Sequence, residues 1–136
     1  MTNYTTDLPG AVDFQSLYLT AGWGNQDKPL EWFEAALKGS WFAVSVYEEE
    51  QLIGFGRIIS DGAIHAFITE MIVHPDWQGR GIGKEVLSRL VDHCQTQGIR
   101  DIQLFCARGK QDFYLKQDFV PRPEDAPGME WKFKHD

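Results

Sequence analysis

The segment from Gln78 to Lys84, QGRGIGK, contains the residue types that bind a phosphate. Closely spaced glycines let backbone N–H groups approach a ligand without obstruction by a Cβ atom. A helical pattern of apolar residues follows, and the N-terminus of a helix adds free N–H donors and a dipole that favours an anion. Arg80 and Lys84 add positive charge. The segment therefore predicts a site for a phosphate or pyrophosphate group.

Three kinds of phosphate loop have glycines at similar spacing, and two of them do not fit. A Walker A loop has glycine five residues before its Gly-Lys pair and a hydroxyl residue after it, whereas Gln78 and Glu85 stand at these positions. A dinucleotide fingerprint would need glycine at Lys84. Gln78, Gly81 and Gly83 match the third pattern, Q/R-x-x-G-x-G/A. The segment thus resembles the coenzyme-A pyrophosphate loop of the GNAT acetyltransferase superfamily.

A second motif lies between Asp112 and Phe119, DFYLKQDF. It resembles the F-Y-x-K-x-G-F segment of the same family, with Asp118 where the family usually has glycine. Aspartate tolerates the left-handed backbone better than most residues, so a helix can still end there. The resemblance covers nearly the whole chain in its order of elements and is strongest from Ala63 to Phe119.

Alternation and turn residues predict the elements that must position these motifs. Helices are expected at 14–21, 29–39, 81–97 and 109–117, and strands at 41–47, 51–59, 63–73, 101–106, 119–120 and 129–133. This order indicates an α+β (α/β layered) domain over residues 1–136, with a parallel strand–helix–strand crossover from Ala63 to Cys106. The resemblance implies a GNAT-like mixed, mostly antiparallel sheet of six to seven strands with about four helices. It also implies a V-shaped cleft between the fourth and fifth strands.

Composition restricts the class of partner. The formal net charge of −7 argues against a nucleic-acid partner and suits a cationic substrate. No apolar run reaches the ~18 residues that span a bilayer, and the first residues do not resemble a signal peptide, so we expect a cytoplasmic protein. Cys94 and Cys106 have no metal-ligand spacing, and we expect both to be reduced, buried and small apolar residues, with no metal bound.

Acetyl transfer to an amine requires a base for the ammonium and a proton donor for the leaving thiolate. Glu70 is the best candidate base, because a carboxylate stands there on an otherwise apolar strand; His65 and His74 are weaker candidates. The resemblance implies that Tyr114 is the general acid. It also implies cofactor-binding residues along the strand, the loop and the second motif, namely Met71, Ile72, Val73, Gln78, Gly79, Arg80, Gly81, Ile82, Gly83, Lys84, Phe113 and Lys116.

The acceptor is expected to be a small primary amine, attacked directly in a ternary complex with acetyl-CoA. Segments such as Gln51–Gly54 and Gly128–Trp131 resemble the plant and cyanobacterial serotonin-type (arylalkylamine) acetyltransferases. Trp23, Phe33 and Met129 are the expected substrate contacts. A non-catalytic acyl-CoA-binding module, an acetyltransferase of protein amines and a nucleotide-binding protein stay open as alternatives. The resemblance also leaves a homodimer open.

Overall fold

Five strands form one mixed sheet whose order follows the chain. They are β1 (Thr2–Thr5), β2 (Phe42–Glu48), β3 (Gln51–Ser60), β4 (His65–Val73) and β5 (Asp101–Leu104). The pairs from β1 to β4 are antiparallel, whereas β4 and β5 are parallel. A parallel pair needs a long connection, and α3 (Ile82–Thr96) provides it. These observations confirm the mixed, mostly antiparallel sheet and the predicted crossover.

The structure is a computed structural model that describes residues 1–133. The chain divides into two compact units, one from Met1 to Phe105 and one that begins at Cys106. The first unit holds the sheet, α1 (Ala11–Leu19), α2 (Leu30–Lys38) and α3, and the second holds α4 (Gln111–Leu115). A single domain over residues 1–136 stays a prediction.

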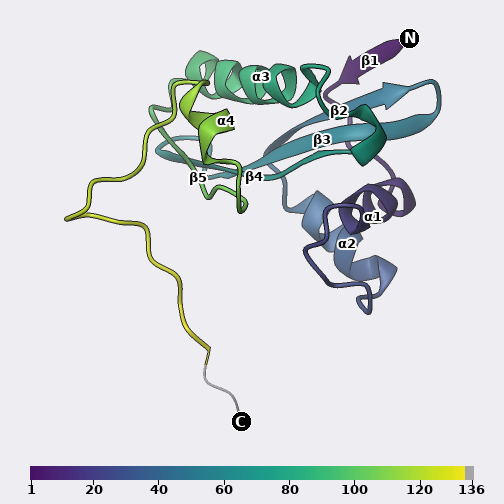
Figure 1. Cartoon of the computed structure of the whole chain (residues 1–136), viewed down its shortest axis with the longest axis horizontal. Coiled ribbons are helices and arrows are strands. Elements are labelled where there is room, and N and C mark those ends of the chain that lie inside the picture. The colour runs from purple at the N-terminus through teal and green to yellow at the C-terminus, as the bar shows by residue number, and fades with distance from the viewer. Residues whose placement is uncertain (134–136) are drawn as a thin grey trace. The chain divides into compact units, whose positions relative to one another are not determined.

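The first unit has three layers, with α3 on one face of the sheet and α1 and α2 on the other (Figure 1). Two glycines of β3 allow α3 to lie close to the sheet. A Cβ atom on Gly56 would come within 2.7 Å of the Met71 sulfur and 2.8 Å of Val86, and one on Gly54 within 2.9 Å of Ile82. Glycine at these two positions therefore permits the close approach of α3 to the sheet.

An aromatic core fills the space between the sheet and the two N-terminal helices. Phe14 of α1, Phe33 of α2 and Phe55 of β3 are each at most 1% exposed. The Phe14 ring meets the Phe33 and Phe55 rings at centroid distances of 6.2 and 5.0 Å. Burial of each such side chain stabilises the fold by roughly 1.5–3 kcal/mol, so this core fixes α1 and α2 on the sheet.

Several sequence expectations were wrong, among them the sheet of six to seven strands, because the described residues form a sheet of five. The structure shows a first strand, β1, that was not expected, and residues 119–133 contain none of the expected strands. Pro121, Pro123 and Pro127 fix φ and remove amide donors in that segment, which hinders pairing. Cys106 is exposed rather than buried and lies after the end of β5, whereas Cys94 is buried as expected. No helix within residues 1–133 is long and apolar enough to cross a bilayer.

Candidate active site

The phosphate loop begins with a short 3-10 turn, η1 (Pro75–Trp77), directly after β4. The His74 side chain accepts a hydrogen bond from the Asp76 amide at 3.1 Å and so caps this turn. The Gln78 side-chain amide donates to the Val73 carbonyl at 3.0 Å. Gln78 therefore ties the loop back to the last residue of β4, which gives the first position of the motif a structural role.

Gly79 and Gly81 give the loop its shape. Their φ angles are +79° and +81°, in the left-handed region that glycine adopts at the least cost. A Cβ atom added to either residue would meet nothing within 4 Å, so open space lies beside the backbone where a ligand would approach. The loop therefore fits the phosphate-binding role that the sequence predicts.

The helix after the loop adds donors and charge. Helix α3 begins at Ile82, which is 5% exposed and anchors the helix against the sheet. The first N–H groups of a helix have no acceptor within the helix, and they carry the positive end of its dipole. Lys84 is exposed in this first turn, and the Arg80 guanidinium lies 4.6 Å from the Trp77 ring centroid. These groups suit a phosphate or pyrophosphate group.

A bulge interrupts β4 next to the loop. Phe55 pairs with Ile72 and Arg57 with Thr69, so Gly56 of β3 faces two residues, Glu70 and Met71. Glu70 has a φ of +49°, which is rare outside glycine. Bulges bend a strand and redirect its side chains. β4 therefore carries a bulge at Glu70 and Met71.

The parallel ladder between β4 and β5 is short. It runs from His65–Asp101 to Ile68–Leu104 and stops before Glu70. Residues 69–73 of β4 therefore continue without ladder partners on the β5 side. This unpaired edge includes Met71, Ile72 and Val73, which the resemblance implies to be cofactor-binding.

The Glu70 carboxylate is held by an ion pair. Its Oε1 accepts from Arg57 Nε at 2.7 Å, and its Oε2 accepts from the Thr69 hydroxyl at 3.1 Å. Arg57 also donates through Nη1 to the Ala36 carbonyl of α2 at 3.0 Å. Arg57 was not among the site residues predicted from the sequence. Its signal was available, because Arg57 is the only charged residue between Gln51 and Asp61 on an otherwise apolar strand.

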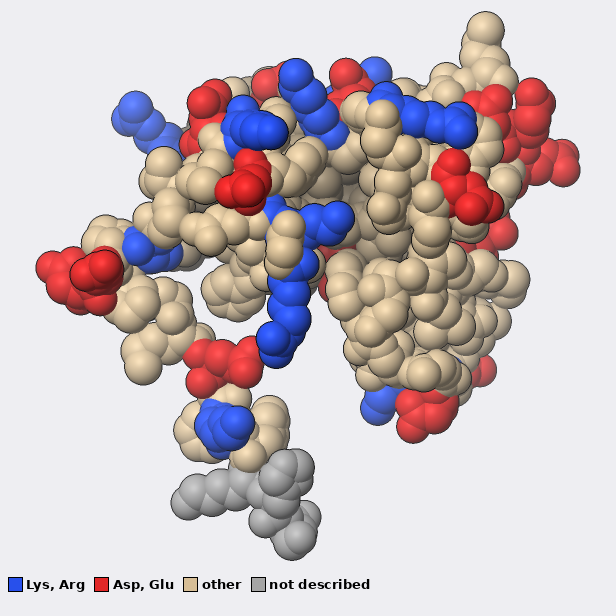
Figure 2. Space-filling view, viewed as in Figure 1, with Lys and Arg blue, Asp and Glu red and all other residues tan. Residues whose placement is uncertain are grey.

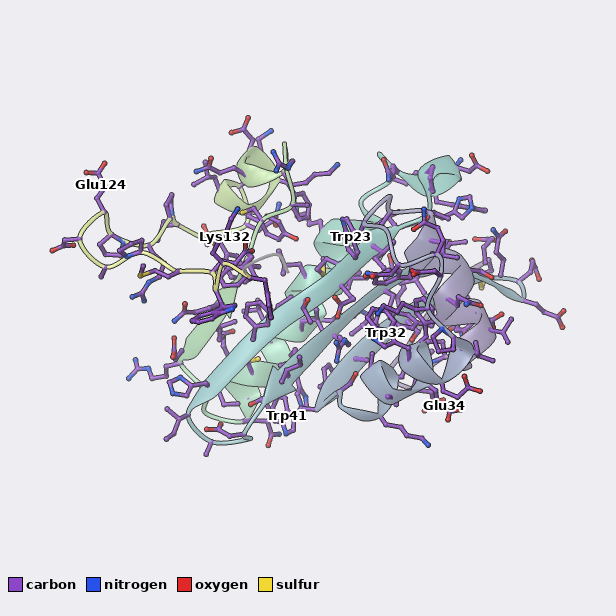
Figure 3. The ribbon with its side chains drawn as sticks, turned by 90° about the horizontal axis from the view of Figure 1, so that it is seen from below. Trp23, Trp32, Glu34, Trp41, Glu124 and Lys132 are labelled. Atoms are coloured by element: carbon purple, nitrogen blue, oxygen red, sulfur yellow. The ribbon has the colours of Figure 1, made fainter. Side chains whose placement is uncertain are left out.

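Aromatic residues cluster on the same face of the sheet. Tyr18 is 8% exposed, and its ring meets those of Trp23 and Phe33 at 5.4 Å and that of Trp32 at 6.2 Å. Trp23 and Trp32 are 41% and 39% exposed and lie on the side of the sheet that α1 and α2 cover (Figure 3). Phe33 is fully buried, so it supports this surface from behind rather than meeting a substrate directly.

His65, the other histidine considered as a base, is bonded to a carboxylate. His65 Nδ1 pairs with the Asp101 carboxylate at the start of the β4–β5 ladder, five residues before Glu70 along the strand. The described residues contain no group of three or more His, Cys, Asp or Glu side chains that could hold a metal ion.

Tyr114 lies in the second unit, on α4. Its ring packs edge-on against Phe113 at 5.0 Å and Phe119 at 6.0 Å. Burial raises the pKa of the Tyr114 hydroxyl to about 12, so the phenol holds its proton throughout the physiological range. Lys116 is exposed after α4, and Asp118 has a φ of +70°, which confirms the left-handed conformation expected there.

Met129, the third expected substrate contact, follows α4 in the second unit. It is 86% exposed and belongs to no strand. Met129 was expected in a terminal strand at 129–133, which the structure does not contain.

Known proteins with similar sequences and structures are acetyltransferases by name. The sequence profile described as "Acetyltransferase (GNAT) family" matches residues 9–119. An uncharacterized N-acetyltransferase, ycf52, from the alga Pyropia yezoensis is 32% identical over 123 residues, which cover 88% of this chain and 70% of the alga's protein. The histone acetyltransferase TAP1 of Glycine max is 33% identical over 134 residues, and the match spans 90% of this chain but 57% of that protein.

Two solved structures have the same fold. A probable acetyltransferase from methicillin-resistant Staphylococcus aureus superposes with a TM-score of 0.86 at 27% identity, over 98% of this chain and 100% of that one. A Clostridium acetobutylicum acetyltransferase solved with acetyl-CoA gives a TM-score of 0.77 at 22% identity, over 97% and 96% of the two chains.

Proposed function

The chain belongs to the GNAT family of acetyltransferases, and on this premise we propose that it transfers the acetyl group of acetyl-CoA to a primary amine of a small molecule. It is thus a GNAT N-acetyltransferase. Acetyl-CoA as the donor is supported by the loop geometry and by the acetyl-CoA present in the clostridial structure of the same fold.

The chain's own residues divide the donor site into two parts. Gly79, Gly81 and the first turn of α3 would hold the pyrophosphate through backbone N–H groups, with Arg80 and Lys84 adding charge. The unpaired edge of β4 at residues 71–73 would bind the pantetheine arm and aim one N–H at the thioester carbonyl. When bound, acetyl-CoA supplies the activated acetyl group. Phe113 and Lys116 are proposed as further contacts on the resemblance alone.

The position of Glu70 is the observation that carries the proposal. The bulge directs this carboxylate toward Arg57, which bonds to α2, so Glu70 lies on the face of the sheet that α1 and α2 cover. An amine arriving from this side would meet a fixed carboxylate beside the edge of β4. We assign Glu70 as the base that takes the proton from the ammonium, directly or through one water.

The surface of α1 and α2 favours an aromatic or cationic amine. Figure 2 shows a mostly uncharged surface over these helices, with acidic side chains gathered instead at the tip of the β2–β3 hairpin. The Lys28 ammonium lies 5.6 Å from the Trp32 ring centroid, so this ring already accepts an alkylammonium on its face. Trp23 and Trp32 would contact an arylalkylamine, in line with the sequence resemblance to the serotonin-type branch.

Tyr114 is proposed as the proton donor to the leaving thiolate. This assignment rests on the family motif and on the burial that keeps its hydroxyl protonated. The cytoplasmic location, a homodimer and Met129 as a substrate contact stay predictions.

An amine panel tests the acceptor class. Thiol release from acetyl-CoA would be followed with tryptamine-like amines, polyamines and aminoglycosides, each with and without the protein. We expect the highest kcat/KM for the tryptamine-like amines. If no amine gives a rate above background although calorimetry shows that coenzyme A binds, the proposal is contradicted. That result would favour a non-catalytic acyl-CoA-binding module.

A protein amine is the second candidate acceptor, because the soybean relative is named a histone acetyltransferase. Adding a lysine-rich histone-tail peptide to the same panel separates a protein acceptor from a small-molecule acceptor. A kcat/KM for the peptide above that for every small amine would replace the small-molecule proposal.

A further inference from the structure

Arg57 is a charged residue inside an otherwise apolar layer. The residue is 8% exposed. The nearest large apolar residues along the strand, Phe55 and Ile58, are both fully buried. Its side chain points to the face of the sheet opposite α3, because the neighbouring Gly56 faces α3 and successive residues of a strand alternate. Burying a guanidinium is costly unless it is paired, so its partners decide what it does.

The two partners of Arg57 belong to different elements. Arg57 Nε donates to Glu70 at 2.7 Å, and Nη1 donates to the Ala36 carbonyl at 3.0 Å. Ala36 lies near the C-terminal end of α2, where the helix dipole favours a cation, and its carbonyl also accepts from the Gly39 amide at 3.2 Å. The end of α2 therefore fixes one side of the planar guanidinium, and the guanidinium in turn fixes Glu70.

The same end of α2 is close to the aromatic surface. Ala36 follows Trp32 by four residues, and residues at this spacing lie on one face of a helix. A molecule that contacts Trp32 would thus bind one helical turn from the carbonyl that holds Arg57. Besides Arg57, the Thr69 hydroxyl is the only side-chain group among the described residues that donates a hydrogen bond to Glu70.

We infer that Arg57 is a positioning residue, which sets the direction of the Glu70 carboxylate and links it to the helix that carries Trp32. The inference rests on the proposed role of Glu70 as the base. Arg57 does not touch the reacting atoms. Without it, the carboxylate would keep only the bond from Thr69 and would leave its productive direction more often, and small misplacements of a catalytic group cost up to ~100-fold in rate.

A double-mutant cycle on the full chain tests this inference. The variants are Arg57→Met, Glu70→Gln and the double variant, with kcat measured against the best amine of the panel. If Arg57 acts through Glu70, Arg57→Met lowers kcat by ~10- to 100-fold and changes the KM for acetyl-CoA by less than ~3-fold. The double variant is then no slower than Glu70→Gln within ~2-fold.

A matched control and a milder variant accompany the cycle. Arg89 Nε lies at the same 2.7 Å from Glu85, but this pair is on the surface of α3, with 46% and 48% of the side chains exposed. Arg89→Met should leave kcat unchanged. Arg57→Lys keeps the charge but not the fork of donors, so its kcat should fall between those of wild type and Arg57→Met. If Arg57→Met melts below the assay temperature, Arg57→Lys takes its place in the cycle.

The outcomes separate this inference from the proposed function. If Glu70→Gln is slow but Arg57→Met is as fast as wild type, Arg57 does not position the base. If both are slow and their losses multiply in the double variant, Arg57 has a structural role alone. If Glu70→Gln is as fast as wild type, the assignment of the base itself is wrong, and the inference falls with it.

Discussion

Tyr114 combines a family motif with a measurable physical property, the raised pKa of its hydroxyl. Its proposed role is to donate a proton or hydrogen bond to the departing sulfur. Replacing it with phenylalanine keeps the ring packing against Phe113 and Phe119 and removes the hydroxyl alone. We therefore expect Tyr114→Phe to lower kcat by ~10- to 100-fold with little change in the affinity for coenzyme A.

Steady-state kinetics and calorimetry check this prediction, with Tyr4→Phe as the control. Tyr4 lies on β1 under the Arg89 guanidinium and outside the proposed site. An unchanged kcat and pH profile in Tyr114→Phe would show that the hydroxyl takes no part in the reaction.

The pKa of Tyr114 also predicts a pH dependence of stability. The folded pKa is about 12, whereas an unfolded tyrosine ionises near 10. Between these pH values the unfolded chain loses its proton before the folded chain does, so the free energy of unfolding decreases as pH rises. The contribution is complete below pH ~10, and roughly 1–3 kcal/mol is lost by pH ~12.

Urea unfolding at pH 9 and pH 11.5 measures this difference. The wild type should lose more stability over this interval than Tyr114→Phe, because the titrations of other groups cancel in the comparison. Equal losses in the two proteins would contradict the burial of the hydroxyl.

Single residues also show the limits of reading a sequence. Asp118 was predicted in the left-handed conformation, because the requirement is local and aspartate can meet it. Arg57 was not predicted as part of the site, because its importance depends on Ala36 and Glu70, which lie 21 and 13 residues away in the chain. A periodicity argument cannot identify partners that only the tertiary fold brings together.

At the scale of elements, α3 has left-handed glycines at both ends. Gly81 precedes it with a φ of +81° and Gly98 follows it with a φ of +78°, and a Cβ atom on either would meet nothing within 4 Å. Alanine at either position therefore costs a similar ~1–2 kcal/mol of backbone strain. Only Gly81 lies at the proposed pyrophosphate site.

We expect Gly81→Ala to weaken coenzyme A binding by ~10-fold or more and Gly98→Ala to leave it unchanged, although both lower the melting temperature equally. The added methyl group at Gly81 would occupy the space through which the ligand approaches the backbone. Calorimetric titration with coenzyme A measures both affinities. Equal weakening in the two variants would mean that the loop affects binding through stability alone.

The elements differed in how well the sequence predicted them. The helix at 82–96 and the strands from 42 to 73 carry strong periodic patterns, and the expected bounds agree with the structure within about two residues. β1 has only four residues, two of them exposed, and pairs with β2 about 40 residues later, so no local signal marks it. The strands expected at 119–120 and 129–133 had apolar residues but no partner, and the prolines between them act against pairing.

At the scale of the whole molecule, the sequence established the class of fold and of reaction but not the acceptor. Donor binding needs a contiguous loop, which a motif can show. The proposed acceptor surface combines Trp23, Trp32 and Glu70, which belong to separate parts of the chain. They share one face of the sheet because α1 and α2 pack there and Arg57 links Glu70 to α2. The substrate therefore depends on tertiary packing that no single segment shows.

Acetyl transfer to an aromatic amine is tested by following the acetyl group itself. The protein would be incubated with acetyl-CoA carrying a labelled acetyl group and with tryptamine, and both the released thiol and the acetylated amine would be quantified by mass spectrometry. Direct transfer with Glu70 as the base should give equal amounts of free coenzyme A and labelled N-acetyltryptamine, and a strong reduction of both in Glu70→Gln. Thiol release without labelled amine, or no release while coenzyme A binds, would contradict it.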